Sequence, residues 1–245
     1  ADGNTYNVTA TVTDTAGNAT SDSTSSELVI DTTAPGAPSV VSISTDTGVT
    51  DGVTSDNTLT FTGTAEANST VEVFIDGSSI GTVTADGSGD WTYDHTGTIL
   101  ADATYAVTAT STDAAGNTSS ASSAFDVTVD TTAPGAPTVV TQTTSDLTPT
   151  ITGTATVGAG ETLTVVVSGA TYTVTPAGGG AWSLDLGTET PTSGSLTALA
   201  DGNTYNVTAT VTDTAGNATS DSTSSELVID TTAPGAPSVV SISTD

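Results

Sequence analysis

The chain has 245 residues with 28 Asp and Glu, no Lys or Arg, one His and no Cys, which gives a formal net charge of −28 at pH 7. Without cationic side chains it has nothing to neutralise nucleic-acid phosphates or anionic lipid, and without Cys it has no disulfide, thiol nucleophile or Cys-ligated zinc site. No apolar run reaches 18 residues, so no membrane span is predicted, and any targeting signal is expected outside this sequence.

An unchanged internal repeat organises the sequence. Residues 1–46 recur without a substitution as residues 200–245, which is a period of 199 residues. Half of this period is marked by the segment DTTAPGAP, which begins at Asp31, Asp130 and Asp230. An Asp-Thr-Thr turn followed by two prolines ends a strand and stiffens the chain, so these segments predict domain junctions.

The repeat divides the chain into four pieces. We interpret residues 1–33 as the C-terminal part of one domain, 34–132 as a complete domain, 133–232 as a complete domain of a variant type, and 233–245 as the first strand of a further domain. The two end pieces hold too few strands to bury a core of their own. We therefore expect the natural polypeptide to continue in both directions as a longer tandem array.

Short alternating runs separated by turn residues predict strands, without helices, in both complete domains. The strands predicted in the first of them are, in chain order, Ser39–Ser44, Thr58–Thr64, Thr70–Ile75, Ser79–Thr84, Trp91–Asp94, Thr104–Thr112 and Ala124–Val129. About seven strands in about 100 residues indicate an immunoglobulin-like β-sandwich. The predicted fold class is therefore all-β, with tandem immunoglobulin-like β-sandwich domains in an extended linear array.

Aromatic residues support this interpretation. Tyr105 follows Leu100-Ala-Asp-Ala-Thr and is predicted to form a tyrosine corner, in which the phenol ties the preceding loop to the backbone. Tyr205 repeats the arrangement in the second complete domain, and Tyr6 marks it in the N-terminal piece. Trp91 and Trp182 are predicted to lie in the sandwich cores rather than to form a platform for sugar rings.

The first complete domain resembles the bacterial Ig-like tandem repeats of giant surface adhesins of the RTX or biofilm-associated type, which are exported by type I secretion. The resemblance rests on TGTAE near the second strand, a G-x-W element, the turn TDAAGN and the closing DTTAP. The second domain departs from it, because TVGAGETLTVVVSG replaces TAEANSTVEVFIDG and TQTTSDLTPT gives a shorter first loop. The resemblance implies that such repeats form a long extender and bind calcium at domain junctions.

The charge also favours calcium, because the 28 carboxylates have no basic partner and repel one another. Ca²⁺ prefers all-oxygen ligands, including carbonyl groups and water. The alternative is a solvated acidic surface that keeps a secreted protein soluble. The candidate ligands, which gather where consecutive domains would meet, are Asp2, Asp31, Asp46, Asp51, Asp56, Asp102, Asp113, Asn117, Asp130, Asp201, Asp213, Asn217 and Asp230.

These candidates form three groups. We expect Asp2 and Asp31 to face Asp113, Asn117 and Glu66; Asp46, Asp51, Asp56, Asp102 and Asp130 to face Asp213 and Asn217; and Asp201 and Asp230 to begin a third junction. The turn TDAAGN has a second interpretation, an ordinary turn in which Asp accepts hydrogen bonds from its own backbone and Gly takes a positive φ.

No enzymatic activity is predicted. His95 is expected to be an exposed turn residue rather than a general base or a metal ligand. Asp90 and Asp94 flank Trp91, and although two carboxylates are what a glycosidase needs, these are expected to face solvent beside a core Trp.

The predicted function is structural: an extender or stalk of a giant extracellular adhesin or surface fibre, secreted to the cell surface and rigidified by calcium at its junctions. Its expected partners are neighbouring repeats of the same polypeptide, with homotypic lateral contacts left open, and neither nucleic acid nor membrane insertion is expected. One alternative is a ligand- or glycan-binding adhesion module. The other is a surface filament protein that assembles laterally.

Overall fold

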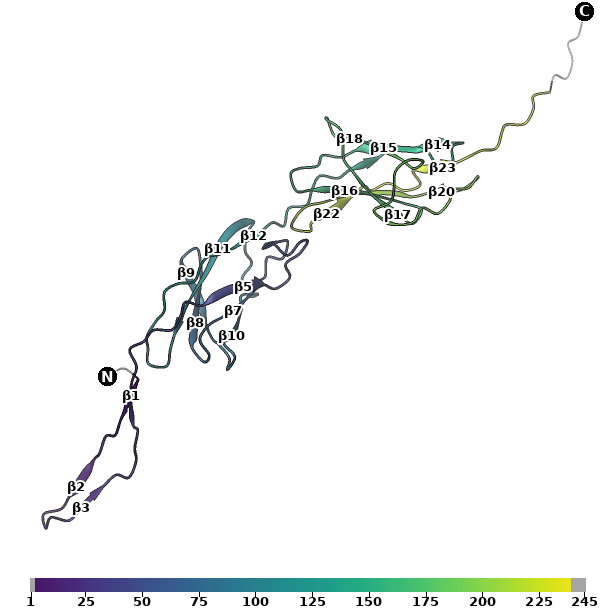
Figure 1. Ribbon diagram of the computed structural model, residues 1–245. Coiled ribbons are helices and arrows are strands. Elements are labelled where there is room, and N and C mark those ends of the chain that lie inside the picture. The colour runs from purple at the N-terminus through teal and green to yellow at the C-terminus, as the bar shows by residue number, and fades with distance from the viewer. Residues whose placement is uncertain (1–2, 239–245) are drawn as a thin grey trace, which may run out of the picture. The chain divides into compact units, whose positions relative to one another are not determined.

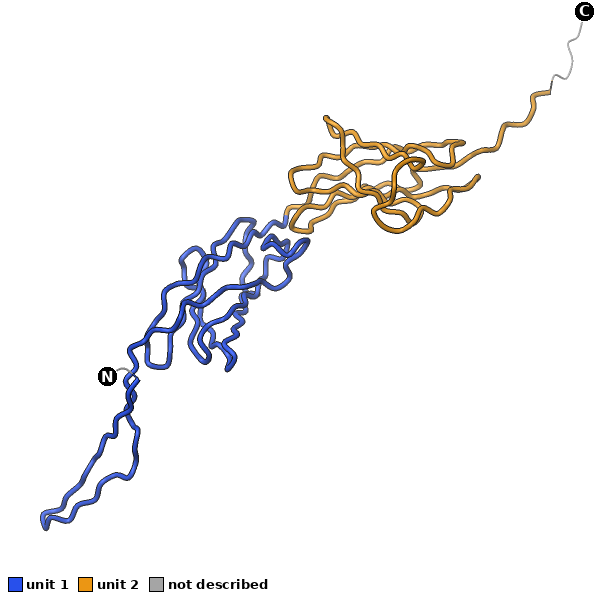
Figure 2. The backbone as a smooth tube through the Cα atoms, viewed as in Figure 1, with its two compact units in different colours: residues 1–131 blue, residues 132–245 orange. Residues whose placement is uncertain are grey.

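The computed structural model describes residues 3–238, which form strands and contain no helix. The chain divides into two compact units, residues 1–131 and 132–245 (Figure 2). Each unit contains one β-sandwich, and unit 1 also contains a hairpin formed by its N-terminal residues (Figure 1). In the described part of the chain, no helix is long and apolar enough to cross a membrane.

The sandwich of unit 1 is built from eight strands. They are β5 Ser39–Ile43, β6 Val53–Thr54, β7 Thr60–Thr64, β8 Thr70–Ile75, β9 Ser78–Thr84, β10 Asp90–Asp94, β11 Ala103–Thr112 and β12 Phe125–Val129. One sheet has the order β10–β7–β5 and the other the order β6–β12–β11–β8–β9. All pairs are antiparallel except β6 with β12, which is parallel.

The seven strands predicted between residues 34 and 132 are confirmed, with ends that shift by at most two residues. The additional strand, β6, was not predicted. It is only two residues long and lies in a loop rich in Asp and Gly, where it pairs with Thr128 and Val129. The predicted all-β class with two successive sandwiches is also confirmed, because unit 2 repeats the architecture.

Alternation along the strands builds the core of each sandwich, with apolar residues inward and Thr or Ser outward. In unit 1 the fully buried side chains include Leu59, Phe61 and Val107. Trp91 and Trp182 are each only 3% exposed, which confirms that both are core residues. The tyrosine corner is confirmed at Tyr105, whose hydroxyl donates to the carbonyl oxygen of Ala101 at 2.9 Å.

The sandwich of unit 2 is built from eleven strands. They are β13 Thr138–Val139, β14 Gln142–Thr144, β15 Thr150–Thr154, β16 Thr162–Val167, β17 Ala170–Val174, β18 Ala181–Asp185, β19 Ser193–Gly194, β20 Thr204–Tyr205, β21 Val207–Thr212, β22 Ala218–Ser220 and β23 Leu227–Ile229. The sheets have the orders β13–β15–β18, β14–β23–β20 and β19–β17–β16–β21–β22. At its own corner, the Tyr205 hydroxyl accepts a hydrogen bond from the Ala200 N–H at 2.9 Å.

The hairpin of unit 1 consists of residues 3–33 and is called the N-terminal hairpin below. Its strands are β1 Asn4–Tyr6, β2 Thr11–Thr13, β3 Ala19–Ser21 and β4 Leu28–Ile30, which pair as β1–β4 and β2–β3. Its sequence is identical to that of β20–β23 and their connections. The further strand expected in 233–245 falls largely on residues 239–245, which lie outside the described residues.

Candidate metal sites at the poles of the domains

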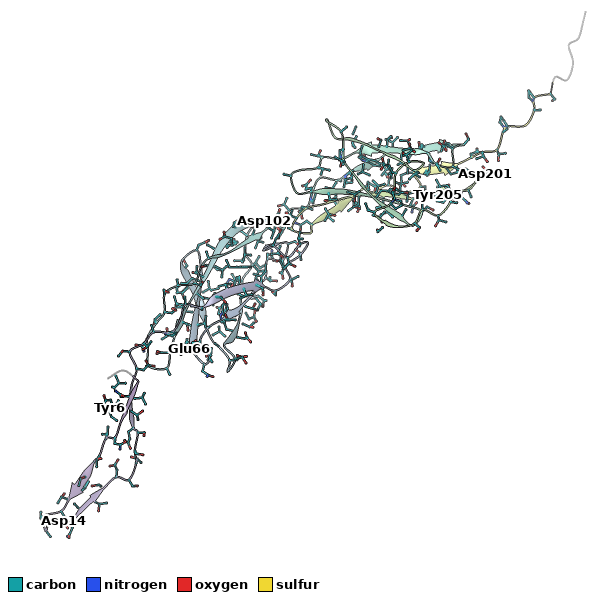
Figure 3. The ribbon with its side chains drawn as sticks, in the orientation of Figure 1. Tyr6, Asp14, Glu66, Asp102, Asp201 and Tyr205 are labelled. Atoms are coloured by element: carbon teal, nitrogen blue, oxygen red, sulfur yellow. The ribbon has the colours of Figure 1, made fainter. Side chains whose placement is uncertain are left out.

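Most of the predicted ligands of the first complete domain lie at the pole where β12 ends. The Asp130 N–H donates to the carbonyl oxygen of Thr54 at 2.9 Å, so the end of β6 is held beside the end of β12. Asp102 precedes β11 (Figure 3), and its Oδ1 accepts from the N–H of Thr131 at 3.1 Å and from its hydroxyl at 2.8 Å. Three separate parts of the sequence are thereby brought together, as the strand order predicted.

The acidic loop at this pole is shaped by its own carboxylates. Asp46 Oδ2 accepts from the Gly52 N–H at 3.0 Å, and Asp51 Oδ1 accepts from the Val53 N–H at 3.0 Å. Asp56 Oδ1 accepts from the N–H and the hydroxyl of Thr58 at 2.9 and 2.8 Å. Each of the three carboxylates therefore uses one oxygen to fix a turn, and none has a cationic partner, since the sequence contains no Lys or Arg.

One oxygen in this loop lacks a partner. Asp46 Oδ1 is buried and has no hydrogen bond to any described residue. A buried carboxylate oxygen without a partner is costly, and water or a cation is its natural complement. The surrounding donors are carboxylate, hydroxyl and carbonyl oxygens, which is the chemistry that Ca²⁺ selects. The residues at this pole therefore fit a calcium ion by donor type.

At the opposite pole of the same domain, acidic side chains meet the end of the N-terminal hairpin. Asp31, Glu66 and Asp113 line a cavity of about 320 Å³, whose other walls are Val29, Ala114 and Ala115. The Asn117 side-chain amide donates to the carbonyl oxygen of Asp31 at 3.2 Å. The structure thus brings together four of the residues predicted for this junction. The fifth, Asp2, lies outside the described residues.

The TDAAGN turn has the local geometry of an ordinary Asp turn. Asp113 Oδ1 accepts from the N–H groups of Ala115 and Asn117, both at 2.9 Å, and its Oδ2 accepts from the Asn117 side-chain amide at 2.8 Å. Gly116 has a φ of 94°. The Asn117 amide is the largest of several hydrogen bonds that hold the pKa of Asp113 below its ordinary value. The turn interpretation is confirmed, and metal binding by the same carboxylate stays a prediction.

The corresponding turn of unit 2 is built in the same way. Asp213 Oδ1 accepts from the Asn217 N–H at 2.8 Å, and its Oδ2 accepts from the Asn217 side-chain amide at 2.9 Å. These two residues belong to unit 2, whereas the acidic loop that they were predicted to face belongs to unit 1. That these residues face one another across the junction stays a prediction.

At the end of the unit 2 sandwich, Asp201 accepts hydrogen bonds in much the same way as Asp102 does in unit 1. Asp201 accepts from the Thr231 N–H at 2.5 Å through Oδ1 and from the Thr232 hydroxyl at 3.0 Å through Oδ2. The Thr231 N–H is the main cause that lowers the pKa of Asp201. Asp230 Oδ1 accepts from the Thr232 N–H at 3.0 Å. The first loop of unit 2, in the segment TQTTSDLTPT, is shorter than that of unit 1 and has no residues that correspond to Asp46 and Asp51.

Within residues 3–238, no three side chains of His, Cys, Asp or Glu lie close enough to hold one metal ion together. An ion at either pole would therefore draw most of its ligands from backbone carbonyl groups, hydroxyl groups, amides and water. Ca²⁺ accepts such mixed oxygen shells of six to eight ligands. Calcium binding remains a prediction for all thirteen candidate residues.

The prediction for His95 was wrong in one respect. Its ring is half-buried rather than exposed, and it lies near the rings of Phe61 and Tyr93, with centroid distances of 6.1 and 6.2 Å. Asp90 and Asp94 are exposed, as predicted. Asp94 accepts from the N–H and hydroxyl of Thr96, and the hydroxyl is the main cause that lowers its pKa.

Sequence reasoning missed a buried acid in unit 2. Glu226 is 1% exposed, its Oε2 accepts from the Val207 N–H at 2.9 Å, and its Oε1 has no hydrogen bond to any described residue. Asp221 accepts in the same way from the Ala209 N–H at 2.8 Å. Along this part of β21, the two carboxylates thus replace the backbone carbonyl groups that a paired strand would offer as acceptors. An acidic residue just before a strand normally faces solvent, so the sequence carries no signal for this burial.

The chain is similar to several solved structures. A structure from a 1.5-MDa bacterial ice-binding adhesin has 27% identity, covers 91% of this chain and 73% of that chain, and gives a TM-score of 0.38. The CbhA fibronectin(III)-like modules of Clostridium thermocellum have 15% identity, 77% and 94% coverage, and a TM-score of 0.46. The BSP domain of a biofilm-associated protein has 20% identity, 82% and 30% coverage, and a TM-score of 0.28.

No curated protein sequence matches the chain significantly. The family assignment rests on sequence, because all three TM-scores lie below 0.5. The family described as Bacterial Ig-like domain matches residues 34–131 and again residues 138–231. These two matches cover most of the chain and coincide with its two sandwiches. The chain therefore belongs to the bacterial Ig-like domain family, of which it contains two tandem copies.

Proposed function

We propose that the chain is a section of an extracellular stalk, in which tandem Ig-like domains hold an adhesive or otherwise functional end of a longer surface protein away from the cell. The observation that carries this proposal is the unchanged recurrence of residues 1–46 as residues 200–245. A specific ligand site has no need to be copied without a substitution, whereas a spacer gains length from every copy. The proposal assigns no chemical reaction to the chain.

We further propose that Ca²⁺ binds at the poles and stiffens the connections between domains. Three observations support calcium binding. The buried Oδ1 of Asp46 has no hydrogen bond to any described residue, and Asp102 and Asp130 lie at the same pole. The sequence also contains no Lys or Arg that could pair with these carboxylates. At such a pole a bound divalent ion would replace carboxylate repulsion by attraction. An ion that binds only the folded state would also stabilise the domains by mass action.

The test is a thermal melt of the full chain in excess EDTA and in millimolar Ca²⁺, with small-angle X-ray scattering under both conditions. Calcium is expected to raise the melting temperature and to increase the maximum dimension of the particle. Asp46→Asn is expected to reduce the calcium-dependent rise. Asp90→Asn is the matched control, because it removes the same charge from an exposed position at the start of β10, which lies opposite Thr64 and outside the acidic loop that holds Asp46.

Three outcomes bear on the alternatives. Equal melting and scattering in EDTA and calcium would contradict the stiffening role and leave the acidic residues as a solubilising surface. An ordered lattice or multi-chain fibre from the purified chain would favour the laterally assembling filament protein. Glycan binding would need aromatic rings at the surface, and both Trp side chains, which are the best platforms, are buried. Saturable binding on a glycan array would nevertheless favour that alternative.

A further inference from the structure

We propose that the sandwich of unit 2 has a docking site for one kind of partner, an extended segment of another protein that carries Lys or Arg. The segment lies along the open edge of β17 and continues the ladder that β19 begins there, and its basic side chain meets Glu189 at the rim of the site. The residues of this site lie outside residues 200–245, which are the repeated part of unit 2. The site therefore belongs to the variant part of the domain and adds a function to that of a spacer.

The first step in the argument is that one edge of β17 is paired only in part. β16 pairs with all five residues of β17, whereas β19 pairs only with Ala170 and Thr171. The Thr192 N–H donates to the Thr171 carbonyl oxygen at 2.8 Å, and the residue before it is Pro191. Because proline has no N–H to donate, the ladder of β19 cannot continue along the rest of β17.

The second step is that the unpaired part of this edge presents the backbone of Thr173. A strand residue directs its N–H and C=O to one side of the strand, and the next residue directs them to the other. The Thr171 carbonyl group faces the side of β19. Thr173, two residues later, directs both of its backbone groups to the same side, beyond the end of β19. Such open donors and acceptors are what an added strand pairs with.

The third step is that there is space beside this edge. β17 and β18 belong to different sheets of the sandwich (Figure 1). A cavity of about 270 Å³ has walls from both strands and from the chain that follows β18, among them Thr173, Thr175, Ser183, Leu184, Glu189 and Thr190. An extended backbone can therefore reach the open edge without displacing a strand of the domain.

The fourth step is a contrast with unit 1, where β9 and β10 take the places of β17 and β18. The Tyr93 hydroxyl of β10 donates to the carbonyl oxygen of Ile80 in β9, and both side chains pack against the core, so this bond ties the two sheets together. Leu184 takes the place of Tyr93 in unit 2, two residues after the core Trp. Since leucine has no hydroxyl group, the variant domain lacks this tie at the wall of its cavity.

The fifth step concerns the chemistry of the occupant. Glu189 is exposed and lines the cavity, and the chain has no Lys or Arg that could pair with it. A formal net charge of −28 repels acidic segments, including those of a second copy, and attracts basic ones. The occupant that fits is therefore a segment of another protein whose backbone pairs with Thr173 and whose cationic side chain pairs with Glu189.

The experiment adds the acetylated and amidated peptide Lys-Thr-Val-Thr-Lys to the ¹⁵N-labelled full chain in EDTA and follows the backbone amide signals by NMR. The signals of residues 172–175 and 189–190 are expected to move and to saturate, and added salt is expected to weaken the binding. The matched control probe is the peptide Glu-Thr-Val-Thr-Glu, which has the same length and the same central residues. It is expected to leave these signals in place.

Two substitutions separate the backbone contact from the charge. Thr173→Pro removes the N–H that the added strand uses and is expected to abolish the response; this N–H faces the open edge, so the pairing of β17 with β16 is kept. Glu189→Gln is expected to weaken the binding about two- to fivefold, which is the range for an exposed ion pair. Glu72→Gln, on β8 of unit 1, is the matched control and is expected to leave the affinity unchanged.

Several results would overturn the proposal. They are unchanged signals at a millimolar excess of the basic peptide, shifts that map away from β17, an equal response to the acidic peptide, and an undiminished response of a folded Thr173→Pro chain. Signals of residues 172–175 that depend on the concentration of the chain alone would identify a second copy of the chain as the occupant instead. The map on the unsubstituted chain does not depend on the folding of a variant. Because EDTA is present throughout, the outcome is separate from that of the proposed stalk and its calcium sites.

Discussion

Trp91 lies directly across the β7–β10 pair from Gly63, so close that a methyl group on Gly63 would lie 2.5 Å from Cζ2 of the indole and 1.9 Å from the carbonyl oxygen of Ser39. Gly153 and Trp182 repeat the relationship in unit 2, with corresponding distances of 2.4 Å to the indole and 1.9 Å to the carbonyl oxygen of Thr138. The TGT and G-x-W elements of the sequence are therefore two halves of one packing arrangement. Only a residue without a side chain lets the indole and the neighbouring strand lie this close.

Gly63→Ala is accordingly expected to destabilise the sandwich of unit 1. The added methyl group must displace backbone on one side or the buried indole on the other, and overpacking of this kind costs about 1–3 kcal/mol. Urea unfolding followed by Trp fluorescence measures the loss. Gly97→Ala serves as the control, because a methyl group there meets no atom within 4 Å. Equal stability of the two variants would show that the β7–β10 pair adapts without cost.

Much of this fold is predictable because its determinants are local. Alternation of apolar and hydroxyl side chains fixes the strands, and the positions of Tyr105 and Trp91 identify the corner and the core. What sequence reasoning missed depends on contacts between distant segments. His95 is half-buried beside Phe61, which belongs to the neighbouring strand β7, as well as beside Tyr93, two residues before it.

The candidate metal sites were likewise predictable only in part. Strand order predicted correctly that Asp31, Glu66 and Asp113 would gather at one pole. Whether carboxylates at a pole bind an ion depends on their separations to within a fraction of an ångström, which alternation and turn signals do not determine. The N-terminal hairpin makes the distinction concrete, since one sequence forms the same hydrogen bonds twice but is buried once.

The repeated sequence offers a matched test of burial. Leu227→Ala is expected to lower the free energy of unfolding of unit 2 by about 2–5 kcal/mol, because Leu227 lies in the core and its loss leaves a cavity. Leu28→Ala makes the same change in the same local sequence, where the side chain is exposed. It is expected to leave both sandwich transitions unchanged in calorimetry. A comparable loss from Leu28→Ala would mean that the hairpin face is already covered in solution.

A second matched test concerns Glu226. Glu226→Ala leaves the Val207 N–H without its acceptor in a buried position, which is expected to cost about 1–3 kcal/mol. Glu226→Gln keeps an acceptor oxygen and removes a buried charge that has no cationic partner, so it is expected to be at least as stable as the wild type at pH 7. Chemical denaturation of unit 2 measures both changes.

Glu27, which corresponds to Glu226 in the repeated sequence, provides the control for these two substitutions. Glu27 also accepts a hydrogen bond, from the Val8 N–H at 2.9 Å, but it lies at the surface. Glu27→Ala is therefore expected to leave the unfolding of both sandwiches unchanged. If Glu226→Gln proved as destabilising as Glu226→Ala, the charge itself would be required, which would point to a bound cation at Oε1.

The TDAAGN turn makes the stability of unit 1 depend on pH. The pKa of Asp113 is held below its ordinary value of 3.8, chiefly by the Asn117 side-chain amide. A lowered pKa in the folded state means that ionised Asp113 favours folding above pH 3.8 and that this contribution is lost as the pH falls through the folded-state pKa. Asp113→Asn removes the ionisation. The melting temperature of the variant is thus expected to lie below that of the wild type at pH 7, with a gap that narrows below pH 3.8.

Calorimetry of the wild type and the variant across this range measures the gap. Asp14→Asn is the control, because Asp14 makes the same turn with Asn18 and its pKa is lowered by the same contact, but its turn belongs to the N-terminal hairpin rather than to a sandwich. This substitution is expected to shift neither sandwich transition at any pH. A gap for Asp113→Asn that stays constant down to about pH 2 would show that the turn stabilises the domain through its geometry alone, without a contribution from the charge.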